Sequence, residues 1–207
     1  NQGQICLCGS RIFVEEKIYE QFKEDFVAAT KRLKVGSPLE KGTDVGAIVS
    51  KPHLEKILSH VNDAANQDAK ILCGGKTLKI EGYEKGYFIE PTVIEVKSNR
   101  CKLNQEEIFG PVVTIMPFKT EEEAIEMAND VRYGLSSTIW TGNLDRTMRL
   151  SNRIEAGIVW VNTWLNRDLR TPFGGVKDSG VGREGGFEAL RFFTEPKNVC
   201  ISYQPES

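Results

Sequence analysis

The sequence predicts an α/β domain built around a largely parallel sheet. Segments with strand character and segments with helical periodicity alternate from about residue 11 to residue 162. Such alternation is typical of a sheet whose strands are joined by helical crossovers. The chain has 207 residues, of which 40% are apolar and 27% charged, so it can bury a core of ordinary size.

The first part of the alternation predicts three strands and two helices. Residues 11–16 (RIFVEE) predict a short strand, and apolar side chains then recur at helical spacing until Gly36. A second amphipathic helix is predicted over 51–69, where Pro52 suits the first turn. The elements expected after it are a strand at 69–75, a loop or hairpin at 76–88 and a strand at 91–96.

The second part continues the pattern. Residues 106–118 join a short helical turn to a buried strand, and the capping box at Thr120 predicts a helix over 121–130. The elements expected after it are a strand at 135–141, a helix at 143–154, a strand at 156–162, an irregular region at 163–186 and a strand at 194–203. Because nothing downstream covers the terminal strand, we expect it to pair with another chain.

Charge and cysteine content argue against several classes of function. The formal net charge of −2 offers no bulk attraction to nucleic acid or to an anionic membrane. No apolar run approaches the roughly 18 residues that a membrane span needs. Five scattered cysteines favour a reducing, cytoplasmic compartment over a disulfide framework. His53 and His60 have no acidic or thiol company, and no metal site is expected.

The opening segment NQGQICLC contains two thiols, Cys6 and Cys8. A thiol is most often a small buried hydrophobic group. Gly3 would let the backbone approach a ligand, and ICLC could form a short helical turn whose dipole stabilises a thiolate. Residues two positions apart do not share a helical face, so at most one thiol should point into a given site.

Glu107 and Phe109 lie in the segment EEIFGP. Glu107 is either a solvated acid or a carboxylate that accepts hydrogen bonds from a sugar diol. In the second case Phe109 would supply an apolar surface beside a ring. The Gly-Pro step makes the loop stiff, as a binding site requires.

The segment NRDLRTPFGG carries two arginines, Arg167 and Arg170, on either side of Asp168. A solvated charge run is one explanation. The other is a planar guanidinium that binds a substrate carboxylate bidentately, with Trp164 and Phe173 as apolar walls.

Residues 180–185 (GVGREG) match G-x-G-x-x-G literally. In a dinucleotide-binding fold this motif follows the first strand and opens a helix. Few residues remain after it here, and they are predicted to end in a strand, so no βαβ unit fits. These glycines are expected to shape a tight loop.

Four segments stand in the order and at the spacings of one family: NQGQ-x-C, EEIFGP, PFGG-x-K-x-SG-x-GRE and TE-x-K. The chain resembles the aldehyde dehydrogenase superfamily over essentially its whole length. The resemblance implies a three-layer catalytic domain over 1–193 and an oligomerisation strand with a tail over 194–207. It also implies that the Rossmann-type NAD-binding domain, the general-base Glu and the oxyanion-hole Asn lie outside this chain.

The resemblance implies roles for individual residues. Cys6 matches the nucleophile, which attacks the aldehyde carbon and passes through a thiohemiacetal and a thioester to the acid. Glu107 matches the ligand of the nicotinamide ribose hydroxyls, and Phe109 matches the aromatic residue beside that ribose. Lys56 matches a position at the edge of the cofactor. Phe173 matches the floor of the substrate channel. Glu184 matches an acid on the water or proton path.

The loop before PFGG indicates which group of enzymes within the superfamily the chain resembles. RDLRTPFGGVK with ICLC resembles the 2-hydroxymuconic and 2-aminomuconic semialdehyde dehydrogenases, whose substrates carry a carboxylate. Arg167 matches the position expected to bind that carboxylate, while Arg170 would assist or neutralise Asp168. Two alternatives stay open. One is a broad-specificity enzyme for retinal, betaine or aliphatic aldehydes, and the other is a non-catalytic binding or structural module.

The resemblance also implies cofactor and partners. NAD is the expected cofactor, with NADP as the alternative, and the substrate is a small-molecule aldehyde. A cytoplasmic homodimer or homotetramer is the expected assembly. These 207 residues alone are expected to turn over no aldehyde, because half of the cofactor site would be missing.

Overall fold

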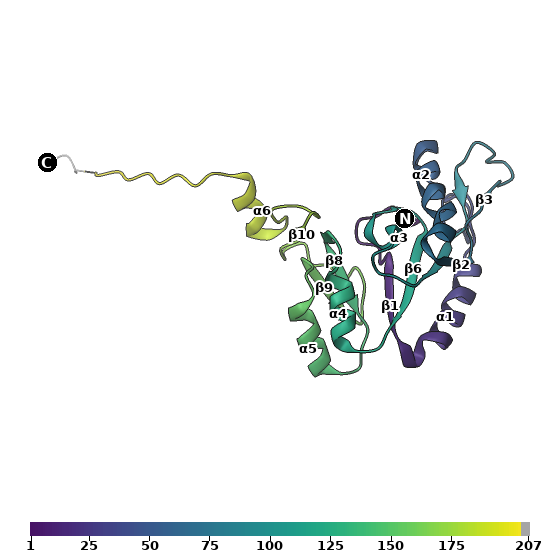
Figure 1. Cartoon of the computed structure of the whole chain (residues 1–207). Helices are drawn as coiled ribbons and strands as arrows, with labels where there is room; N and C mark the ends of the chain where they lie inside the picture. Colours follow the sequence, from purple (N-terminus) through teal and green to yellow (C-terminus); the bar gives the residue numbers. More distant parts are fainter. Residues whose placement is uncertain (204–207) are drawn as a thin grey trace.

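The computed structural model describes residues 1–203, which form two parts side by side (Figure 1). The first part is a four-stranded sheet with the order β1-β6-β5-β2. Its strands are β1 (Arg11–Glu15), β2 (Ala69–Cys73), β5 (Thr92–Val96) and β6 (Val112–Phe118). β1 and β5 run parallel to β6, whereas β2 is antiparallel to β5. The prediction of a largely parallel sheet is confirmed.

Helices cover both faces of this sheet, namely α1 (Glu16–Lys31) and α2 (Lys51–Asn62). Successive strand side chains point to opposite faces. Val93 of β5 therefore packs with Tyr19 of α1, while its neighbour Ile94 packs with Ile57 of α2. The helix–sheet–helix order is the three-layer arrangement that the family resemblance implied.

The second part of the molecule is smaller. Its strands β8 (Ser136–Ile139) and β9 (Ile158–Val161) form a parallel pair, and β7 (Tyr133–Gly134) pairs antiparallel with β10 (Val176–Lys177). Its helices are α4 (Glu121–Asn129), α5 (Leu144–Arg153) and α6 (Gly186–Phe193). The hydroxyl of Thr120 accepts a hydrogen bond from the Glu123 N–H, which confirms the predicted start of α4.

Arg11 of β1 joins the two parts. Its guanidinium donates to the carbonyl oxygens of Met127 and Ala128 at the end of α4, at 3.0 and 2.9 Å. Burial lowers the pKa of Arg11 to about 10. Cations near a helix C-terminus are favourable because the last carbonyl groups lack partners within the helix.

Several element boundaries differ from the sequence prediction. The helix predicted over 51–69 ends at Asn62, and a short turn η1 (Ala64–Gln67) follows it. Residues 76–88 were expected to form a loop or a hairpin, and the structure has a hairpin of β3 (Thr77–Leu78) and β4 (Phe88–Ile89). The helix α6 was missed, because its apolar positions follow a run of glycines that indicates a loop.

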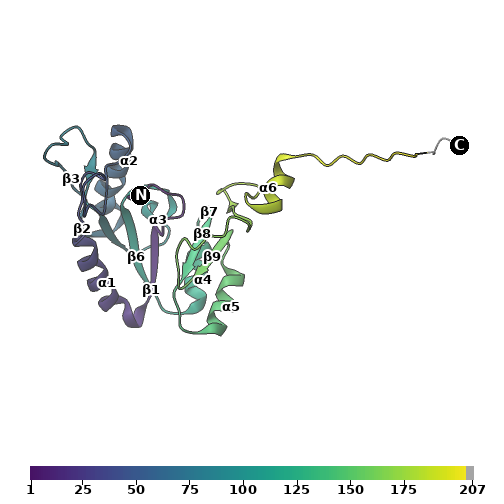
Figure 2. The same ribbon diagram turned by 180° about the vertical axis from the view of Figure 1, so that it is seen from behind.

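The strand predicted at 194–203 does not form in the described part of the chain. After α6 these residues are exposed and run away from both parts of the molecule (Figures 1 and 2). A strand needs a neighbour for its backbone N–H and C=O groups, and no described segment lies beside this one. Its pairing with a second chain stays a prediction, and residues 204–207 of the predicted tail lie outside the described residues.

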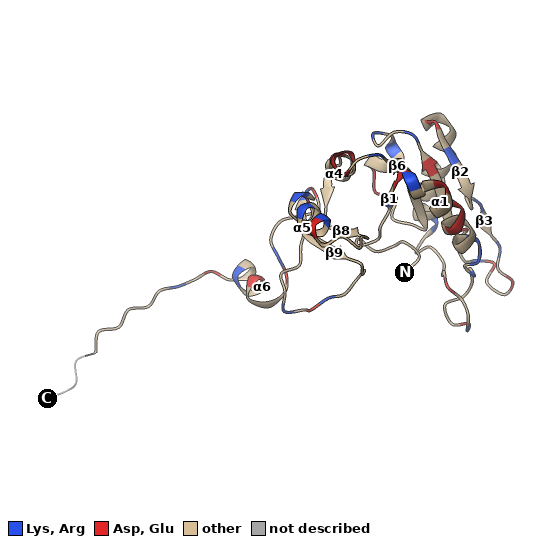
Figure 3. Ribbon diagram, turned by 90° about the horizontal axis from the view of Figure 1, so that it is seen from below, with Lys and Arg blue, Asp and Glu red and all other residues tan. Residues whose placement is uncertain are grey.

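Basic and acidic positions both occur along the ribbon (Figure 3). Acidic residues of α4 face basic residues of α5, and Glu121 accepts hydrogen bonds from Arg146 and Arg149.

Within residues 1–203 no helix combines the length and apolar character that crossing a bilayer requires. The same residues contain no group of three or more His, Cys, Asp or Glu side chains placed to hold a metal ion.

Glu95 links the sheet to α1. Its carboxylate accepts hydrogen bonds from the Tyr19 hydroxyl at 2.8 Å and from Lys23 Nζ at 2.9 Å. Burial raises the pKa of Glu95, but these hydrogen bonds and the charges of Lys23 and Lys70 together outweigh burial. The pKa of Glu95 is therefore lower than its usual value.

We expect Glu95→Gln to lower the free energy of unfolding at neutral pH and to matter less in acid. A carboxyl whose pKa is depressed by folding stabilises the fold above its unfolded pKa, and this contribution disappears as the pH falls through the folded pKa. Urea unfolding from about pH 7 to about pH 3 measures the difference between wild type and variant. Glu24→Gln, at an exposed position of α1, is the control. A difference that stays constant with pH would contradict this expectation.

Candidate active site

The first eight residues place Cys6 at the surface of the molecule. Cys6 is exposed, whereas its neighbour Leu7 is buried. The Cys8 N–H donates to the Ile5 carbonyl oxygen at 3.2 Å, so ICLC forms a single tight turn. The sequence allowed a short helical turn here, and the structure has one turn that no helix continues. No helix dipole acts on Cys6 from this segment.

Cys8 lies in a different environment from Cys6. Its side chain is half-buried, and its Sγ donates to Asn1 Oδ1 at 3.6 Å. Burial raises the pKa of the Cys8 thiol, which disfavours its thiolate at neutral pH. Of the two thiols, Cys6 is the one that a ligand can reach.

Gly3 brings the Cys6 turn against the segment that carries Glu107. Gly3 has a φ of +77°, and a Cβ atom there would lie 2.0 Å from the carbonyl oxygen of Gly110. Only glycine permits both this backbone conformation and this close approach. The amino terminus accordingly lies near α3 (Lys102–Gln105), which precedes the segment (Figures 1 and 2).

The two glutamines of NQGQ anchor the turn to the chain that precedes α2. Gln2 Nε2 donates to the Ala47 carbonyl oxygen at 2.8 Å. Gln4 Oε1 accepts from the Val49 N–H at 3.1 Å, and it also accepts from Gln2 Nε2 at 3.2 Å. The amide-rich opening therefore has a structural explanation that does not depend on any ligand.

Residues 106–110 are held from α2. Lys56 Nζ lies 2.7 Å from the Glu107 carbonyl oxygen, and His53 Nε2 lies 2.6 Å from the Phe109 carbonyl oxygen. The segment forms no helical turn, contrary to the prediction, because α3 ends at Gln105 and Phe109 takes a φ of +60°. Such a conformation is unusual for a residue with a side chain and persists where neighbours hold it.

Glu107 itself presents a free carboxylate. The residue is exposed, and its carboxylate oxygens accept no hydrogen bond from the rest of residues 1–203. Phe109, two positions on, is half-buried. An uncommitted carboxylate two positions before an aromatic residue, on a held backbone, is suited to a ligand with a diol and a flat ring.

Trp164 connects a third segment to the Cys6 turn. Its indole Nε1 donates to the Leu7 carbonyl oxygen at 3.0 Å, across 157 positions of sequence. Trp160 of β9 donates similarly to the Asn166 carbonyl oxygen at 3.0 Å. These two indoles fix the start of the loop that carries Arg167.

Arg167, Phe173 and Glu184 lie together. Phe173 and Glu184 exchange both backbone hydrogen bonds, at 2.7 and 2.8 Å. The Arg167 guanidinium lies 3.9 Å from the centre of the Phe173 ring and 3.3 Å from Glu184 Oε1. Arg170 is different, because its side chain is 89% exposed and binds Asp168 bidentately. Of its two predicted roles, neutralising Asp168 is the one observed.

Some contacts could not be found from sequence spacing. His60, for which no acidic company was expected, lies 3.0 Å from the Glu106 carboxylate. The two residues are 46 positions apart, so only the fold shows their contact.

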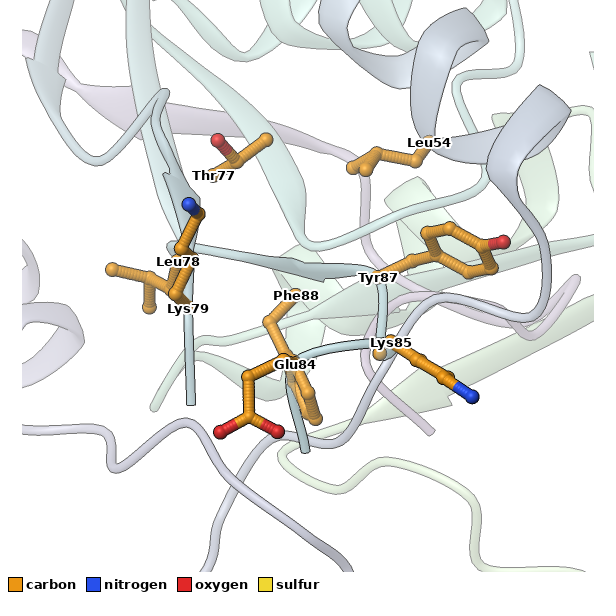
Figure 4. A pocket seen from close by; sticks show the side chains of 9 residues that line it. Leu54, Thr77, Leu78, Lys79, Glu84, Lys85, Tyr87 and Phe88 are labelled. Carbon is orange, nitrogen blue, oxygen red and sulfur yellow. The ribbon is translucent and has the colours of Figure 1, made fainter. Parts of the chain in front are cut away.

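A cavity of about 510 Å³ between the β3–β4 hairpin and Leu54 of α2 is lined by none of the predicted site residues (Figure 4).

Comparison with known proteins identifies the family. Residues 1–199 match the model of the aldehyde dehydrogenase family. The chain belongs to the aldehyde dehydrogenase family. This aldehyde dehydrogenase chain is 48% identical to 2-aminomuconic semialdehyde dehydrogenase of Bos taurus, over 98% of its own length. It is 43% identical, over 97% of its length, to 2-hydroxymuconic semialdehyde dehydrogenase of Pseudomonas sp. (strain CF600).

Solved structures agree with this assignment. HpcC from Thermus thermophilus superposes on the whole aldehyde dehydrogenase chain with a TM-score of 0.92 and 41% identity. A betaine aldehyde dehydrogenase point mutant from Staphylococcus aureus, in complex with NAD+, superposes on 93% of it with a TM-score of 0.90 and 38% identity. The chain covers 41% and 39% of these structures, and 42% of each curated relative above.

Proposed function

We propose that this chain forms the nucleophile-bearing part of an NAD-dependent aldehyde dehydrogenase that oxidises a carboxylate-bearing semialdehyde. The observation that carries the proposal is the position of the Cys6 turn between two loops. Gly3 packs on Gly110 on one side, and Leu7 is hydrogen-bonded to Trp164 on the other. An exposed thiol is thereby joined to the loops that carry the free Glu107 carboxylate and the Arg167 guanidinium.

Cys6 would act as the nucleophile. Its thiolate adds to the aldehyde carbon, and the carbonyl electron pair moves onto oxygen, where the Cys6 backbone N–H can donate to it. The carbon then carries a hydrogen that can leave with its electron pair. NAD, when bound, supplies the acceptor for that hydride.

Glu107 and Phe109 fit the nicotinamide ribose end of this cofactor. The Glu107 carboxylate makes no hydrogen bond within residues 1–203 and can accept two hydroxyl donors. The Phe109 ring would pack beside the sugar. Lys56 would act indirectly, because its ammonium group holds the Glu107 carbonyl oxygen. The NAD+ complex of the related betaine aldehyde dehydrogenase supports this choice of cofactor.

Arg167 would bind the distant carboxylate of the substrate. A guanidinium has five N–H donors, and the pair with Glu184 uses one of them. The Phe173 ring beneath the guanidinium would restrict its movement and supply an apolar wall. The relatives named for 2-aminomuconic and 2-hydroxymuconic semialdehydes support a substrate of this class.

Arg167→Ala should lower kcat/KM for the charged semialdehyde by about 10- to 100-fold and change it little for an uncharged aldehyde of similar length. The measurement is NADH formation by the protein at its full natural length, with 2-hydroxymuconic semialdehyde as the charged substrate. Arg132→Ala, which removes an exposed arginine paired with Asp178, is the control. Equal losses on both substrates would show that Arg167 does not select the carboxylate.

A broad-specificity aldehyde dehydrogenase is the second candidate. The observation in its favour is that both arginines of the loop already have carboxylate partners, Glu184 for Arg167 and Asp168 for Arg170. The likeness to betaine aldehyde dehydrogenase structures is consistent with it. In that case the charged and uncharged aldehydes would react alike in the wild-type protein.

The domain division and the assembly belong to the same proposal. Residues 1–193 would form the catalytic domain, and 194–207 would pair with another subunit in a homodimer or homotetramer. Within the described part of this segment, the apolar side chains alternate along the extended backbone and are exposed. These side chains are Val199, Ile201 and Tyr203.

A further inference from the structure

Two tryptophan side chains hold the chain on either side of Leu165. The Trp164 indole Nε1 donates to the Leu7 carbonyl oxygen at 3.0 Å. The Trp160 indole Nε1 donates to the Asn166 carbonyl oxygen, also at 3.0 Å. An indole N–H group can only donate and a carbonyl oxygen can only accept, so both hydrogen bonds have a fixed direction. Neither of them depends on a group that gains or loses a proton.

Leu165 itself has a strained backbone. Its φ is +59°, in the left-handed region that residues with a side chain rarely adopt. Such a conformation persists where the surrounding structure fixes the chain around it. The Trp164 indole is bonded just before Leu165, and the Asn166 carbonyl group is bonded just after it. These two hydrogen bonds therefore set the direction in which the chain enters the next residue, Arg167.

Arg167 is also held from its other side. Its guanidinium lies 3.9 Å from the centre of the Phe173 ring and pairs with Glu184, and Phe173 and Glu184 exchange both backbone hydrogen bonds. The Arg167 side chain is 32% exposed, whereas that of Arg170 in the same loop is 89% exposed. The Arg167 guanidinium thus has a defined place in the fold, which the Arg170 guanidinium lacks.

The Trp164 hydrogen bond ends next to the proposed nucleophile. Leu7, which accepts the bond, directly follows Cys6 in the sequence and is 4% exposed, whereas Cys6 is exposed. A buried Leu7 side chain and a bonded Leu7 carbonyl group both restrict the turn from which the thiol projects. One side-chain hydrogen bond therefore joins the turn of Cys6 to the loop of Arg167.

We infer that Trp164 is a positioning residue that sets the distance between Cys6 and Arg167 and thereby selects the length of the semialdehyde. The inference rests on the proposed function, in which Cys6 attacks the aldehyde carbon and Arg167 binds the carboxylate at the other end. A substrate held at both ends must span the distance between the thiol and the guanidinium. A molecule one carbon too short or too long loses the carboxylate contact or misplaces the aldehyde carbon, and misplacement slows the reaction.

The test compares kcat/KM for unbranched semialdehydes of increasing length, namely succinic, glutaric, adipic and pimelic semialdehyde, with the full-length protein. Wild type should prefer one length over its neighbours by about tenfold or more. Trp164→Phe keeps an aromatic ring but removes the N–H donor, and it should reduce this preference to about threefold or less. Hexanal has no carboxylate and can follow a displaced thiol, so its kcat/KM should change by no more than about threefold.

Two further variants complete the test. Trp140→Phe, at a tryptophan that is 70% exposed, is the control and should keep the length preference of wild type. Trp160→Phe removes the hydrogen bond to Asn166 and should weaken the preference as Trp164→Phe does, so it supplies the comparison if Trp164→Phe fails to fold. Thermal unfolding and NAD binding show which variants are folded. An equal loss for every semialdehyde and for hexanal would mean that Trp164 acts on stability or on Cys6 alone, and would overturn the inference.

The outcomes separate the inference from the proposed function. If wild type prefers the semialdehydes to hexanal but a folded Trp164→Phe variant keeps the length preference, the inference is wrong and the proposed function stands. The same conclusion follows if wild type prefers the semialdehydes but oxidises all lengths alike. If wild type oxidises the semialdehydes and hexanal alike, the proposed binding of a carboxylate by Arg167 is wrong, and the inferred role of Trp164 fails with it.

Discussion

Replacing Cys6 with alanine should abolish aldehyde oxidation by the full-length protein, lowering kcat by more than about 1,000-fold. An aldehyde carbon releases a hydride only after a nucleophile has added to it. Cys6 is the exposed thiol on the turn that contacts both candidate binding loops. Steady-state NADH formation with a saturating aldehyde measures the effect, and NAD binding by the variant shows that it is folded.

Cys8→Ala is the matched control for this prediction. Cys8 lies two positions away but is half-buried, donates to Asn1 and has a raised pKa. We expect its loss to change kcat by no more than about threefold. A thiol reagent should modify Cys6, and an aldehyde or NAD should slow that reaction. An active Cys6→Ala variant would disprove the assignment of the nucleophile.

Gly3→Ala should have the second largest effect, a loss of about 100-fold in kcat/KM from misplacement of the nucleophile. A new Cβ would lie 2.0 Å from the Gly110 carbonyl oxygen, and an L-residue at a φ of +77° is itself strained by about 1–2 kcal/mol. Both contacting groups belong to the backbone, so relief requires the Cys6 turn to move away from residues 107–110. Kinetics and thermal unfolding of the same variant measure the two consequences.

Substitutions at two other glycines are controls that distinguish the effect of the steric clash at Gly3 from the effect of backbone strain. Gly42 also has a positive φ, at +82°, but a Cβ there would meet no atom within 4 Å. Gly42→Ala should therefore lower stability without lowering kcat/KM. Gly9 has neither a positive φ nor a close neighbour, and Gly9→Ala should be near neutral. Wild-type kcat/KM in a folded Gly3→Ala variant would show that the close approach at Gly110 is unimportant for activity.

Local patterns predicted the elements whose residues interact within a few positions. The helical spacing of α1 and the Thr120 cap of α4 depend on short-range geometry and are present in the structure. Motif order also led to the correct family, which the comparison with known proteins confirms. The same local patterns failed at EEIF, because the conformation of residues 106–110 is imposed by α2.

The sequence by itself determined the fold class, the family and the positions of the chemically competent side chains. Only the tertiary structure decided how those side chains are arranged. It distinguished exposed Cys6 from half-buried Cys8, and it paired Arg167 with Glu184 and His60 with Glu106. It also left the predicted terminal strand without a partner in the described chain. The physical reason is that burial, ion pairing and strand pairing each depend on residues distant in sequence, whose positions no local pattern records.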